Sequence, residues 1–254
     1  MNPPATVDIR GIPLTNIALD DVLNAIDAAI VTRTPMRIAF VNADCVNIAA
    51  RDEAYRHDLS SMDWVFADGI GMKIAGKILG QPVRANVNGT DLFPRLCAEL
   101  AGRQGRLFLL GAKPGVAKAA AEWAVGKYPG LAIAGCRDGY FREEDTSSVV
   151  DEIRASRPDV LLVAMGAPRQ EAWIRRHTEA TGAIIALAVG GLFDYYSGNI
   201  PRAPLWMRRF GLEWVWRLSQ EPGRLWRRYL LGNWIFLARV LGDRMRGHVN
   251  GKKI

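Results

Sequence analysis

Short apolar runs alternate along the chain with segments whose apolar residues recur every three to four positions. The runs are rich in β-branched and aliphatic residues and are bounded by Gly, Pro, Asp or Asn, which is typical of buried strands. Six strands are predicted, at residues 37–42, 64–67, 106–111, 131–135, 159–166 and 183–191. Strands alternating with helical segments, such as 116–128 and 168–180, predict an α/β fold with a mostly parallel sheet and helices on both faces.

The end of the chain has a different composition. From Arg202 onward it holds twelve basic and three acidic residues, a net charge of +9, whereas the whole chain carries +7 and the preceding residues therefore carry −2. Five of the eight tryptophans lie in the same segment. We therefore predict an α/β core over residues 1–200 and a basic, Trp- and Arg-rich helical appendage over residues 201–254.

A helix is predicted in this appendage from about Arg224. Apolar residues at spacings of four and three would form one stripe along it: Trp226, Leu230, Trp234, Leu237 and Leu241. A basic amphipathic helix with tryptophan on its apolar face is typical of a segment in a membrane interface, although the same stripe could pack on the body. We expect both, with Trp214 and Trp216 packed near the site and the residues beyond Trp226 on lipid.

The chain shows no signal for crossing a membrane or for secretion. The longest uncharged apolar run of the appendage, residues 229–238, is about half of the ~20 residues that a spanning helix needs. The first residues lack the pattern of a secretory signal. The three cysteines are widely spaced without a C-x-x-C pair, and the three histidines are scattered, so we predict no metal and a reducing compartment. We expect a cytoplasmic protein, peripheral on the inner face of the cell membrane.

Loops after the predicted strands are the candidate sites, because ligands of parallel α/β proteins bind beyond the carboxyl ends of the strands. Four loops carry more than turn residues: N-A-D-C-V-N from Asn42, A-D-G-I-G around Asp68, G-A-K-P-G-V from Gly111 and G-A-P-R-Q-E from Gly166. In the last two, Gly precedes Pro near a helix start, where backbone N–H groups favour a diphosphate, although tight turns would look the same. The sequence has neither G-x-G-x-x-G after a strand nor D-x-D, so we predict no cofactor and no magnesium–diphosphate clamp.

Asp68 is the most informative carboxylate. It follows the strand at 64–67 and precedes Gly69, which lets a substrate approach the backbone closely. A carboxylate in this place can act as a general base when an acceptor hydroxyl comes within hydrogen-bond reach. From spacing alone, a helix N-cap is the somewhat better interpretation.

The loops and the appendage together resemble a known family. The blocks V-F-A-D-G-I-G, N-G-T-D-L, L-G-A-K-P-G-V-A, D-G-Y-F, M-G-A-P-R-Q-E-A-W-I, G-G-L-F-D-Y-Y-S-G, P-R-A-P and G-L-E-W-V-W-R-L-S-Q-E-P-G-R-L-W-R-R are similar, in this order, to the motifs of the WecG/TagA/CpsF glycosyltransferases. The resemblance implies an inverting, metal-independent enzyme that moves a sugar from a UDP-sugar to a polyprenyl-diphosphate-linked saccharide in cell-surface polysaccharide synthesis. It also implies a Rossmann-like core with a C-terminal appendage that completes the active site at the membrane.

The resemblance also assigns roles to single residues. Asp68 matches the proposed base, and this interpretation then outweighs the N-cap. Gln170 matches a donor-binding glutamine, and Tyr140 and Asp194 match positions near the nucleotide, although Tyr140 could be a core aromatic and Asp194 a loop-stabilising residue. Arginines matching basic positions of the appendage, where one or more would meet a diphosphate, are Arg202, Arg224, Arg227 and Arg228. Further candidates for substrate binding in the matched motifs are Gly69, Asn88, Gly111 and Gly166.

Two positions depart from the family's pattern. Many members have T-x-N where this chain has Asn42-Ala43-Asp44, and many have an arginine where it has Asn86, with Arg84 two residues earlier. In the family both positions face the sugar or the catalytic centre. We therefore take Asn42 and Asp44 as candidate catalytic residues and Asn86 as a candidate substrate contact. The donor sugar stays open among N-acetylmannosamine, its uronic acid and glucose.

Two other classes of function stay in view. The interleaved arginines and aromatic residues of the appendage would suit a nucleic-acid-binding protein, but the basic residues are confined to one tail and no binding motif for nucleic acid occurs. Another UDP-sugar enzyme, such as an epimerase or dehydrogenase, would need NAD and its glycine fingerprint. The predicted partners are thus a UDP-sugar donor, a polyprenyl-diphosphate-linked acceptor and the membrane surface, with no nucleic acid.

Overall fold

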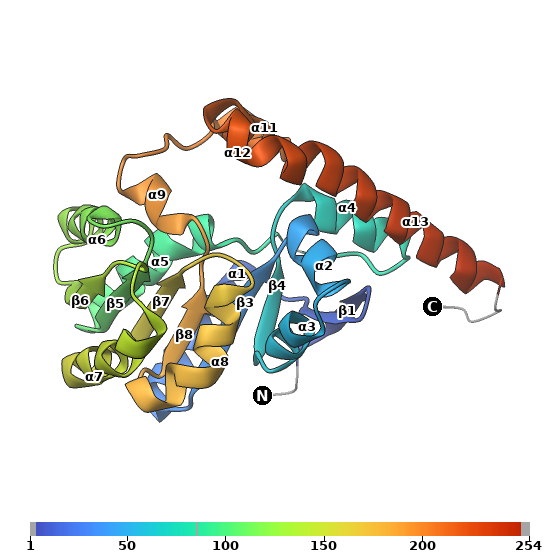
Figure 1. Cartoon of the computed structure of the whole chain (residues 1–254). Coiled ribbons are helices and arrows are strands. Elements are labelled where there is room, and N and C mark those ends of the chain that lie inside the picture. Colours follow the sequence, from blue (N-terminus) through green and yellow to red (C-terminus); the bar gives the residue numbers. More distant parts are fainter. Residues whose placement is uncertain (1–3, 85, 250–254) are drawn as a thin grey trace.

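The computed structural model describes residues 4–84 and 86–249, and its centre is a six-stranded sheet (Figure 1). In sheet order the strands are β4 (Trp64–Ala67), β3 (Met36–Val41), β8 (Ile185–Ala188), β7 (Val160–Ala164), β5 (Arg106–Gly111) and β6 (Ala132–Arg137). All neighbouring strands are parallel. The six predicted strands and the α/β class are therefore confirmed, with strand ends shifted by a few residues.

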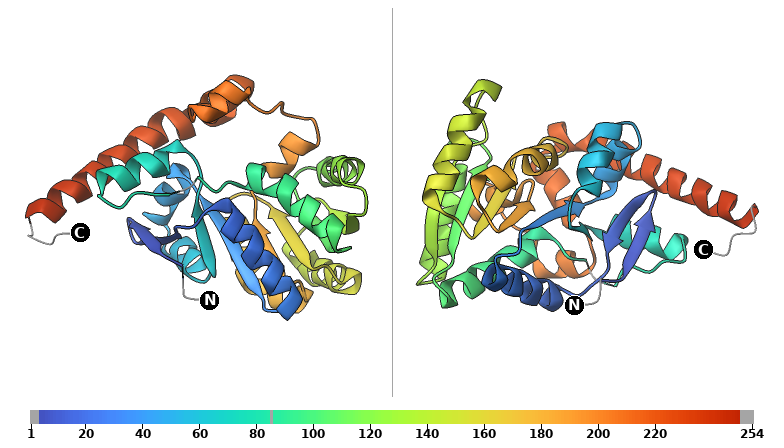
Figure 2. Two further views of the ribbon diagram at one scale, coloured as in Figure 1. Left: turned by 180° about the vertical axis from the view of Figure 1, so that it is seen from behind. Right: turned by 90° about the horizontal axis from the view of Figure 1, so that it is seen from below.

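Both faces of the sheet are covered, because successive residues of each strand point to opposite sides. In β7, Val160 and Leu162 join one hydrophobic cluster, and Leu161 and Val163 join the other. The first cluster includes α1 (Leu19–Thr32), α5 (Gly89–Gly102), α6 (Val116–Lys127) and α9 (Leu192–Tyr196). The second includes α2 (Ala43–Ala49), α3 (Glu53–Ser60), α7 (Thr146–Ser156) and α8 (Arg169–Thr181). Figure 2 shows the first set of helices from behind.

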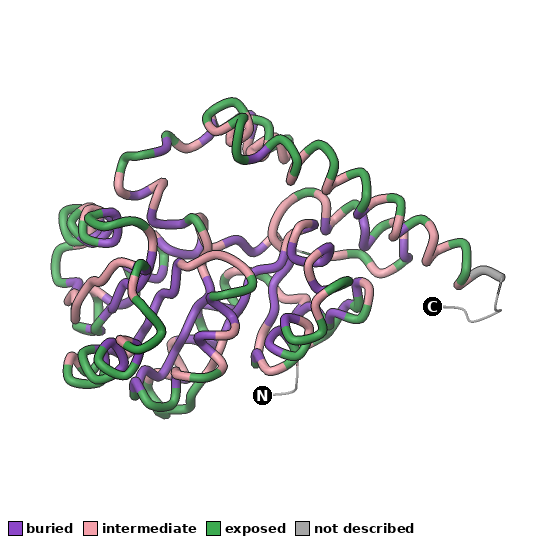
Figure 3. Tube along the Cα trace, in the orientation of Figure 1, coloured by how far each residue is buried: buried purple, intermediate pink, exposed green. Residues whose placement is uncertain are grey.

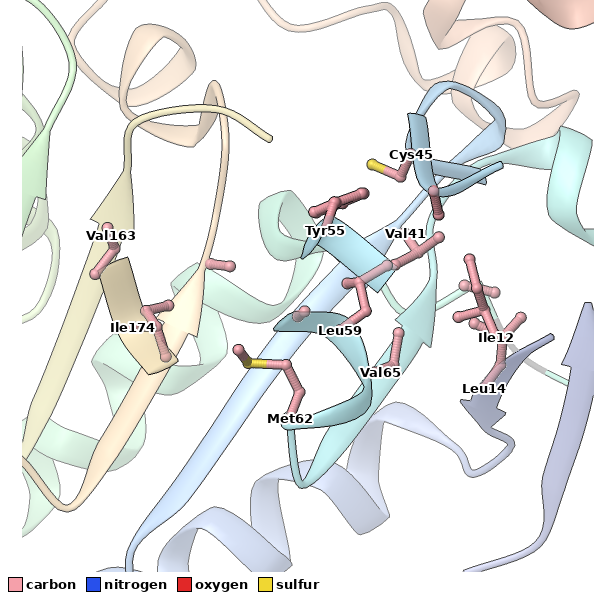
Figure 4. Packing of buried hydrophobic residues seen from close by; sticks show 14 of the residues in the cluster. Ile12, Leu14, Val41, Cys45, Tyr55, Leu59, Met62, Val65, Val163 and Ile174 are labelled. Carbon is pink, nitrogen blue, oxygen red and sulfur yellow. The ribbon is translucent and has the colours of Figure 1, made fainter. Parts of the chain in front are cut away.

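A two-stranded hairpin that the sequence did not predict lies beside β4. It consists of β1 (Thr6–Ile9) and β2 (Ile12–Thr15), paired antiparallel. Thr15 accepts a hydrogen bond from the backbone N–H of Val65 through its hydroxyl, at 3.3 Å. Ile12 and Leu14 are buried against the sheet (Figure 4). Each strand is only four residues long, which is too short for a clear alternating pattern.

The appendage is helical and packs on the body. Its elements are α10 (Leu205–Arg209), α11 (Glu213–Gln220), α12 (Pro222–Trp226), the π-helical turn η2 (Arg227–Leu231) and α13 (Gly232–Val249). In Figure 1, α13 crosses over α2 and α4 (Ile70–Ile78). Phe236 and Val240 of α13 are buried in the same cluster as α2 and α4. Asn47 of α2 donates from Nδ2 to the carbonyl of Gly232 at 2.8 Å and accepts from Arg239 at 3.0 Å, so polar contacts fix the same helix pair.

Most of the predicted apolar stripe is exposed. Trp226, Leu230, Trp234 and Leu241 are accessible to solvent, whereas Leu237 packs against the core. Phe236 and Val240, which lie beside the stripe, provide the contact with the body instead. Figure 3 shows that buried and exposed residues alternate along α13. The appendage therefore has one face for the body and a second apolar face that no described residue covers. Among the described helices, none combines the length and the apolar character that crossing a bilayer requires.

Candidate active site

A cavity of about 1180 Å³ lies beyond the carboxyl ends of the parallel strands, where this architecture places ligands. Loops after all six core strands line it, together with the segment that leads into α5 and with the appendage. The cavity therefore brings together the two parts of the chain that the sequence singled out.

Asp68 lies in this cavity at the end of β4. Its backbone N–H donates to the carbonyl of Val41 at 2.9 Å, which extends the pairing of β3 and β4 by one residue. The N-cap of α4 is Gly69, with a positive φ of 94°, and not Asp68. The N-cap interpretation of Asp68 is therefore wrong. No described residue donates a hydrogen bond to its side chain, which leaves the carboxylate available to a substrate.

The surroundings of Asp68 disfavour its charged form. Burial raises the pKa of this carboxyl from 3.8 to about 6, and the negative charges of Glu213 and Asp91 add to the effect. The positive charge of Arg228 opposes it. A carboxyl with a pKa close to neutrality can both accept and release a proton at physiological pH.

Asn42 and Asp44 line the cavity at the start of α2. Asn42 is the N-cap of this helix, and its Oδ1 accepts from the N–H groups of Asp44 at 3.0 Å and Cys45 at 3.3 Å. Asp44 Oδ2 lies 3.2 Å from Nε of Arg228. Asn42 thus positions the loop, and Asp44 holds an arginine of the appendage; their part in catalysis stays a prediction.

Asn86 and Asn88 also line the cavity. Oδ1 of Asn86 accepts from the N–H of Gly69 at 2.6 Å, so this residue fixes the turn that follows Asp68. Asn88 is the N-cap of α5, where its Oδ1 accepts from the N–H of Asp91 at 2.8 Å and from the hydroxyl of Thr90 at 2.7 Å. Both amide oxygens therefore already have backbone partners.

Gln170 connects the loops after β7 and β8. Its Oε1 accepts from the N–H of Gly190 at 2.9 Å and of Gly166 at 3.2 Å, and its Nε2 donates to Glu171 at 2.9 Å. The side chain is buried at the base of the cavity. The Gly166 N–H, expected to be free for a diphosphate, is thus already paired within the protein.

Glu171 lies behind Gln170 and is fully buried. Its Oε2 has no hydrogen-bond partner among the described residues. Burial raises the pKa of this carboxyl from 4.5 to about 7, with a contribution from the charge of Asp58, and the hydrogen bond from Gln170 opposes the shift. Cys45 and Tyr55 lie nearby and are close to each other (Figure 4). Glu171 was not predicted from the sequence as a residue of the site.

Two predicted contacts on the β5 and β6 side have different outcomes. Gly111 is not among the residues that line the cavity. A Cβ on this residue would lie 2.3 Å from the carbonyl oxygen of Ala164, so a glycine is needed where β5 approaches β7. Its neighbours Ala112 and Lys113 line the cavity instead. Tyr140 does line it, and with 70% of its surface exposed it stands at the rim rather than in the core.

The four predicted arginines of the appendage divide into two pairs. Arg224 and Arg228 line the cavity. Arg202 does not; it forms ion pairs with Asp91 and with Glu213 and donates to the carbonyl of Thr90 at 3.2 Å. Arg227 does not either, because it lies over the ring of Trp226 at 5.3 Å on the outer side. Arg202 therefore fixes the appendage to the start of α5.

Two further arginines of the appendage line the cavity although they were not predicted from the sequence, Arg208 and Arg217. Arg217 lies 3.6 Å from Asp194 and 3.4 Å from Glu221, and its guanidinium covers the ring of Tyr195 at 4.8 Å. Asp194, predicted near the nucleotide, also lines the cavity. A Cβ on Gly191 would lie 2.9 Å from Arg217, so the Gly-Gly pair before L-F-D-Y-Y was the signal in the sequence for a close neighbour.

The described residues include no group of three or more His, Cys, Asp or Glu side chains that could hold a metal ion. The charged groups of the cavity are carboxylates and cations in similar number. The carboxylates are Asp44, Asp68, Asp194, Glu213 and Glu221; the cations are Lys113, Arg169, Arg208, Arg217, Arg224 and Arg228.

The chain is similar in sequence to known proteins. Residues 7–250 match a family described as "Glycosyl transferase WecG/TagA/CpsF family". An N-acetylglucosaminyldiphosphoundecaprenol N-acetyl-beta-D-mannosaminyltransferase of Bacillus spizizenii is 39% identical over 182 residues, which cover 72% of this chain and 70% of the relative. Proteins of the same description from Bacillus subtilis and Staphylococcus aureus are 33% and 30% identical over 226 residues, 89% and 88% of this chain and 87% and 88% of each relative.

The buried carboxyl of Glu171 leads to a prediction for stability. Between pH 4.5 and about 7 it is protonated in the folded chain and ionised in the unfolded chain, so its contribution to the free energy of unfolding falls across this range and is constant above it. We expect the free energy of unfolding of Glu171→Gln to equal that of the wild type near pH 5 and to exceed it by up to about 3 kcal/mol at pH 8. Urea unfolding at both pH values measures the difference.

The matched control is Glu179→Gln, an exposed glutamate on the same helix. It should shift stability by less than about 0.5 kcal/mol at either pH. A Glu171→Gln variant whose stability relative to the wild type does not change between pH 5 and pH 8 would show that the carboxyl is not neutral in the fold.

Proposed function

Because the chain belongs to the WecG/TagA/CpsF family and is a glycosyltransferase, we propose that it moves a sugar from a UDP-sugar to a polyprenyl-diphosphate-linked saccharide, with inversion at the anomeric carbon. The product would be an intermediate of a cell-surface polysaccharide. The observation that carries this proposal is Asp68, a carboxylate with a raised pKa in a large cavity that combines strand-end loops with a basic appendage.

In the proposed reaction, Asp68 accepts the proton of the attacking hydroxyl of the acceptor. The oxygen then forms a bond to the anomeric carbon from the face opposite UDP, while the bond between that carbon and the phosphate oxygen breaks. UDP leaves with the electron pair and its negative charge. Arginine guanidinium groups around the cavity would stabilise this charge, as preorganised cations do for departing phosphates.

Groups suited to the donor lie on the side of β5, β7 and β8. Lys113 and Arg169 line this side of the cavity, and neither lies within 4 Å of a carboxylate among the described residues. Tyr140 stands at the rim nearby. Gln170 and Asp194 would act here by holding their loops in place, because both are already paired within the protein. Cations and an exposed ring are suited to a nucleoside diphosphate.

The relatives suggest which substrates to try first. Their descriptions name an N-acetylmannosaminyl group as the transferred sugar and N-acetylglucosaminyldiphosphoundecaprenol as the acceptor. We therefore propose UDP-N-acetylmannosamine as the first donor and a polyprenyl-diphosphate-linked N-acetylglucosamine as the first acceptor. The uronic acid of N-acetylmannosamine and glucose stay in the panel, since Asn42, Asp44 and Asn86 depart from the pattern common in the family.

A peripheral position on the inner membrane surface belongs to the same proposal. The exposed apolar face of α12 and α13 lies beside exposed arginines, such as Arg224 and Arg227. Such a face gains free energy from burial in the interfacial region, and each nearby base adds about 1 kcal/mol on an anionic leaflet. The cavity would then open close to the lipid-linked acceptor.

The first test is UDP release by the purified chain with EDTA present, across UDP-sugars and with and without the acceptor. We expect release with one donor only when acceptor is added, with the same rate in EDTA. Release that needs no acceptor, or conversion that needs NAD, would contradict the transferase assignment. Binding of an oligonucleotide at physiological salt without any binding of UDP would favour a nucleic-acid-binding protein instead.

The role of Asp68 is tested by Asp68→Asn. We expect turnover to fall by about 10²- to 10⁴-fold because the base is lost, while the Kd for UDP stays within about twofold. In the wild type, kcat/KM should rise with pH through about 6 and then level off, since only the ionised carboxylate accepts a proton. The control is Asp63→Asn, at the other end of the same strand, which should keep normal turnover. Near-normal turnover of Asp68→Asn would exclude this carboxylate as the base.

The membrane role is tested by sedimentation with anionic liposomes. The variant Trp226→Glu with Leu241→Glu changes two exposed apolar residues outside the cavity lining. We expect its partition coefficient to fall by about tenfold or more, because apolar area is lost and negative charge is added. Val31→Glu, at an exposed apolar position on α1, should bind like the wild type. Equal binding by all three proteins would refute the assignment of this face.

A further inference from the structure

The short helix α10 has two sides with different character. Trp206 and Phe210 are 58% and 73% exposed, and Leu205 is exposed with them. Met207 is buried and Arg208 lines the cavity. The turn after this helix lies on α4, because a Cβ on Gly211 would be 2.8 Å from Cβ of Ile70. Since Ile70 follows Asp68 and Gly69 directly, α10 lies beside the candidate base.

The same edge of the cavity is apolar and exposed. Four residues both line the cavity and remain accessible, and we call them the apolar rim: Ile70 and Ile74 of α4, Leu230 of η2 and Trp234 of α13. Trp234 is 74% exposed. The two helices of the rim are in contact beneath it, where a Cβ on Gly71 would lie 3.8 Å from Phe236. The cavity therefore opens from Asp68 onto an apolar surface at the β4 edge of the sheet.

Arg208 differs from the other arginines that the appendage contributes to the cavity. Arg217, Arg224 and Arg228 each lie within 3.6 Å of a carboxylate oxygen. Arg208 has no carboxylate within 4 Å among the described residues, and its buried Nε has no hydrogen-bond partner there. Its charge therefore lacks a close counter-ion, although it favours the ionised form of Glu213. A buried donor without a partner costs free energy unless a ligand supplies an acceptor.

We propose that Arg208 binds the diphosphate of the lipid-linked acceptor and that the apolar rim takes the isoprene units next to it. This inference rests on the proposed function. In such an acceptor the diphosphate stands between the reacting saccharide and the isoprenoid chain. Arg208 has a corresponding position in the protein, because its helix α10 has Asp68 on one side and exposed apolar residues on the other. Guanidinium groups bind diphosphates through two parallel hydrogen bonds.

The donor also carries a diphosphate, but the sheet order separates the two positions. The strands that precede Lys113 and Tyr140 are β5 and β6, at the edge opposite to β4. The elements next to Arg208 and the apolar rim belong to the β4 edge. A donor diphosphate on the β5 and β6 side and an acceptor diphosphate at the β4 edge, where Asp68 lies, match a reaction in which the acceptor oxygen attacks opposite the departing UDP.

Binding of farnesyl diphosphate, a soluble isoprenoid diphosphate, tests this assignment without any turnover. Titrations of farnesyl diphosphate and of UDP are compared for the wild type, Arg208→Ala and Arg209→Ala. Arg209 is exposed on the same helix and does not line the cavity, so it controls for the loss of one charge. We expect Arg208→Ala to raise the Kd for farnesyl diphosphate by about tenfold or more, while its Kd for UDP stays within about twofold of the wild type. The Kd values of Arg209→Ala for both ligands should equal those of the wild type.

The rim is tested by Ile74→Asn. We expect this variant to bind farnesyl diphosphate more weakly and to bind inorganic pyrophosphate like the wild type. Arg208→Ala should bind both ligands more weakly. Weaker UDP binding with unchanged farnesyl diphosphate would assign Arg208 to the donor and overturn the proposal, as would no effect on either ligand. Circular dichroism of each variant separates these results from loss of the fold.

The same variants distinguish this inference from the function on which it rests. If the wild type binds farnesyl diphosphate through Arg208 but shows no acceptor-dependent UDP release, the proposed transferase reaction fails while the isoprenoid diphosphate site stands. If turnover is observed, Arg208→Ala should raise KM for the acceptor by about tenfold and leave KM for the donor unchanged. A higher donor KM with an unchanged acceptor KM would overturn the assignment of Arg208.

Discussion

The contact between α13 and the body, together with the ion pairs of Arg202, holds the appendage over the cavity. Phe236 and Val240 contribute roughly 1.5–3 kcal/mol each by leaving water, and Asn47 adds hydrogen bonds that fix the direction of the helix. The appendage covers the strand-end loops, with Arg217 beside Asp194 and Arg228 beside Asp44. The surroundings of Asp68 are therefore shared between the α/β core and the appendage.

Some cations of the cavity are already paired with carboxylates before any substrate arrives, whereas Lys113, Arg169 and Arg208 are not. Arg228 is held by Asp44, and Arg217 by Asp194 and Glu221. Such pairs allow several cations to sit close together without mutual repulsion. A diphosphate that bound Arg217 or Arg228 would have to exchange their carboxylate partners for phosphate oxygens, so part of its binding free energy would go into breaking ion pairs. At these arginines a ligand with a single weak charge could not compensate for the lost pairs, whereas binding at Lys113, Arg169 or Arg208 would break none.

The sequence predicted those features that depend on local pattern. The six strands of the sheet are continuous apolar runs between clear turn residues, and Asp68 is visible because it follows one of them. The hairpin of β1 and β2 was missed because Asp8 and Pro13 interrupt its two four-residue strands, which therefore form no continuous apolar run. The direction of the appendage arginines could not be predicted, since it depends on how distant helices dock: Arg208 and Arg217 point inward, while Arg202 and Arg227 do not. Gly111 and Glu171 illustrate the same limit. The close approach of β5 to β7 at Gly111 and the burial of Glu171 behind Gln170 depend on tertiary packing, which the local sequence does not show.

The π-helical turn of η2 has a consequence for the length of the chain at this point. Such a turn holds one residue more than an α-helical turn, and each residue of a helix advances the side-chain direction by about 100°. The extra residue within Arg227–Leu231 therefore sets the rotation of everything that follows. Loss of one residue there would turn Phe236 and Val240 away from α2 and α4 and bring other side chains of α13 towards the body. Substitutions can be absorbed at many exposed positions of this segment, but a change in its length would alter the docking of the whole helix.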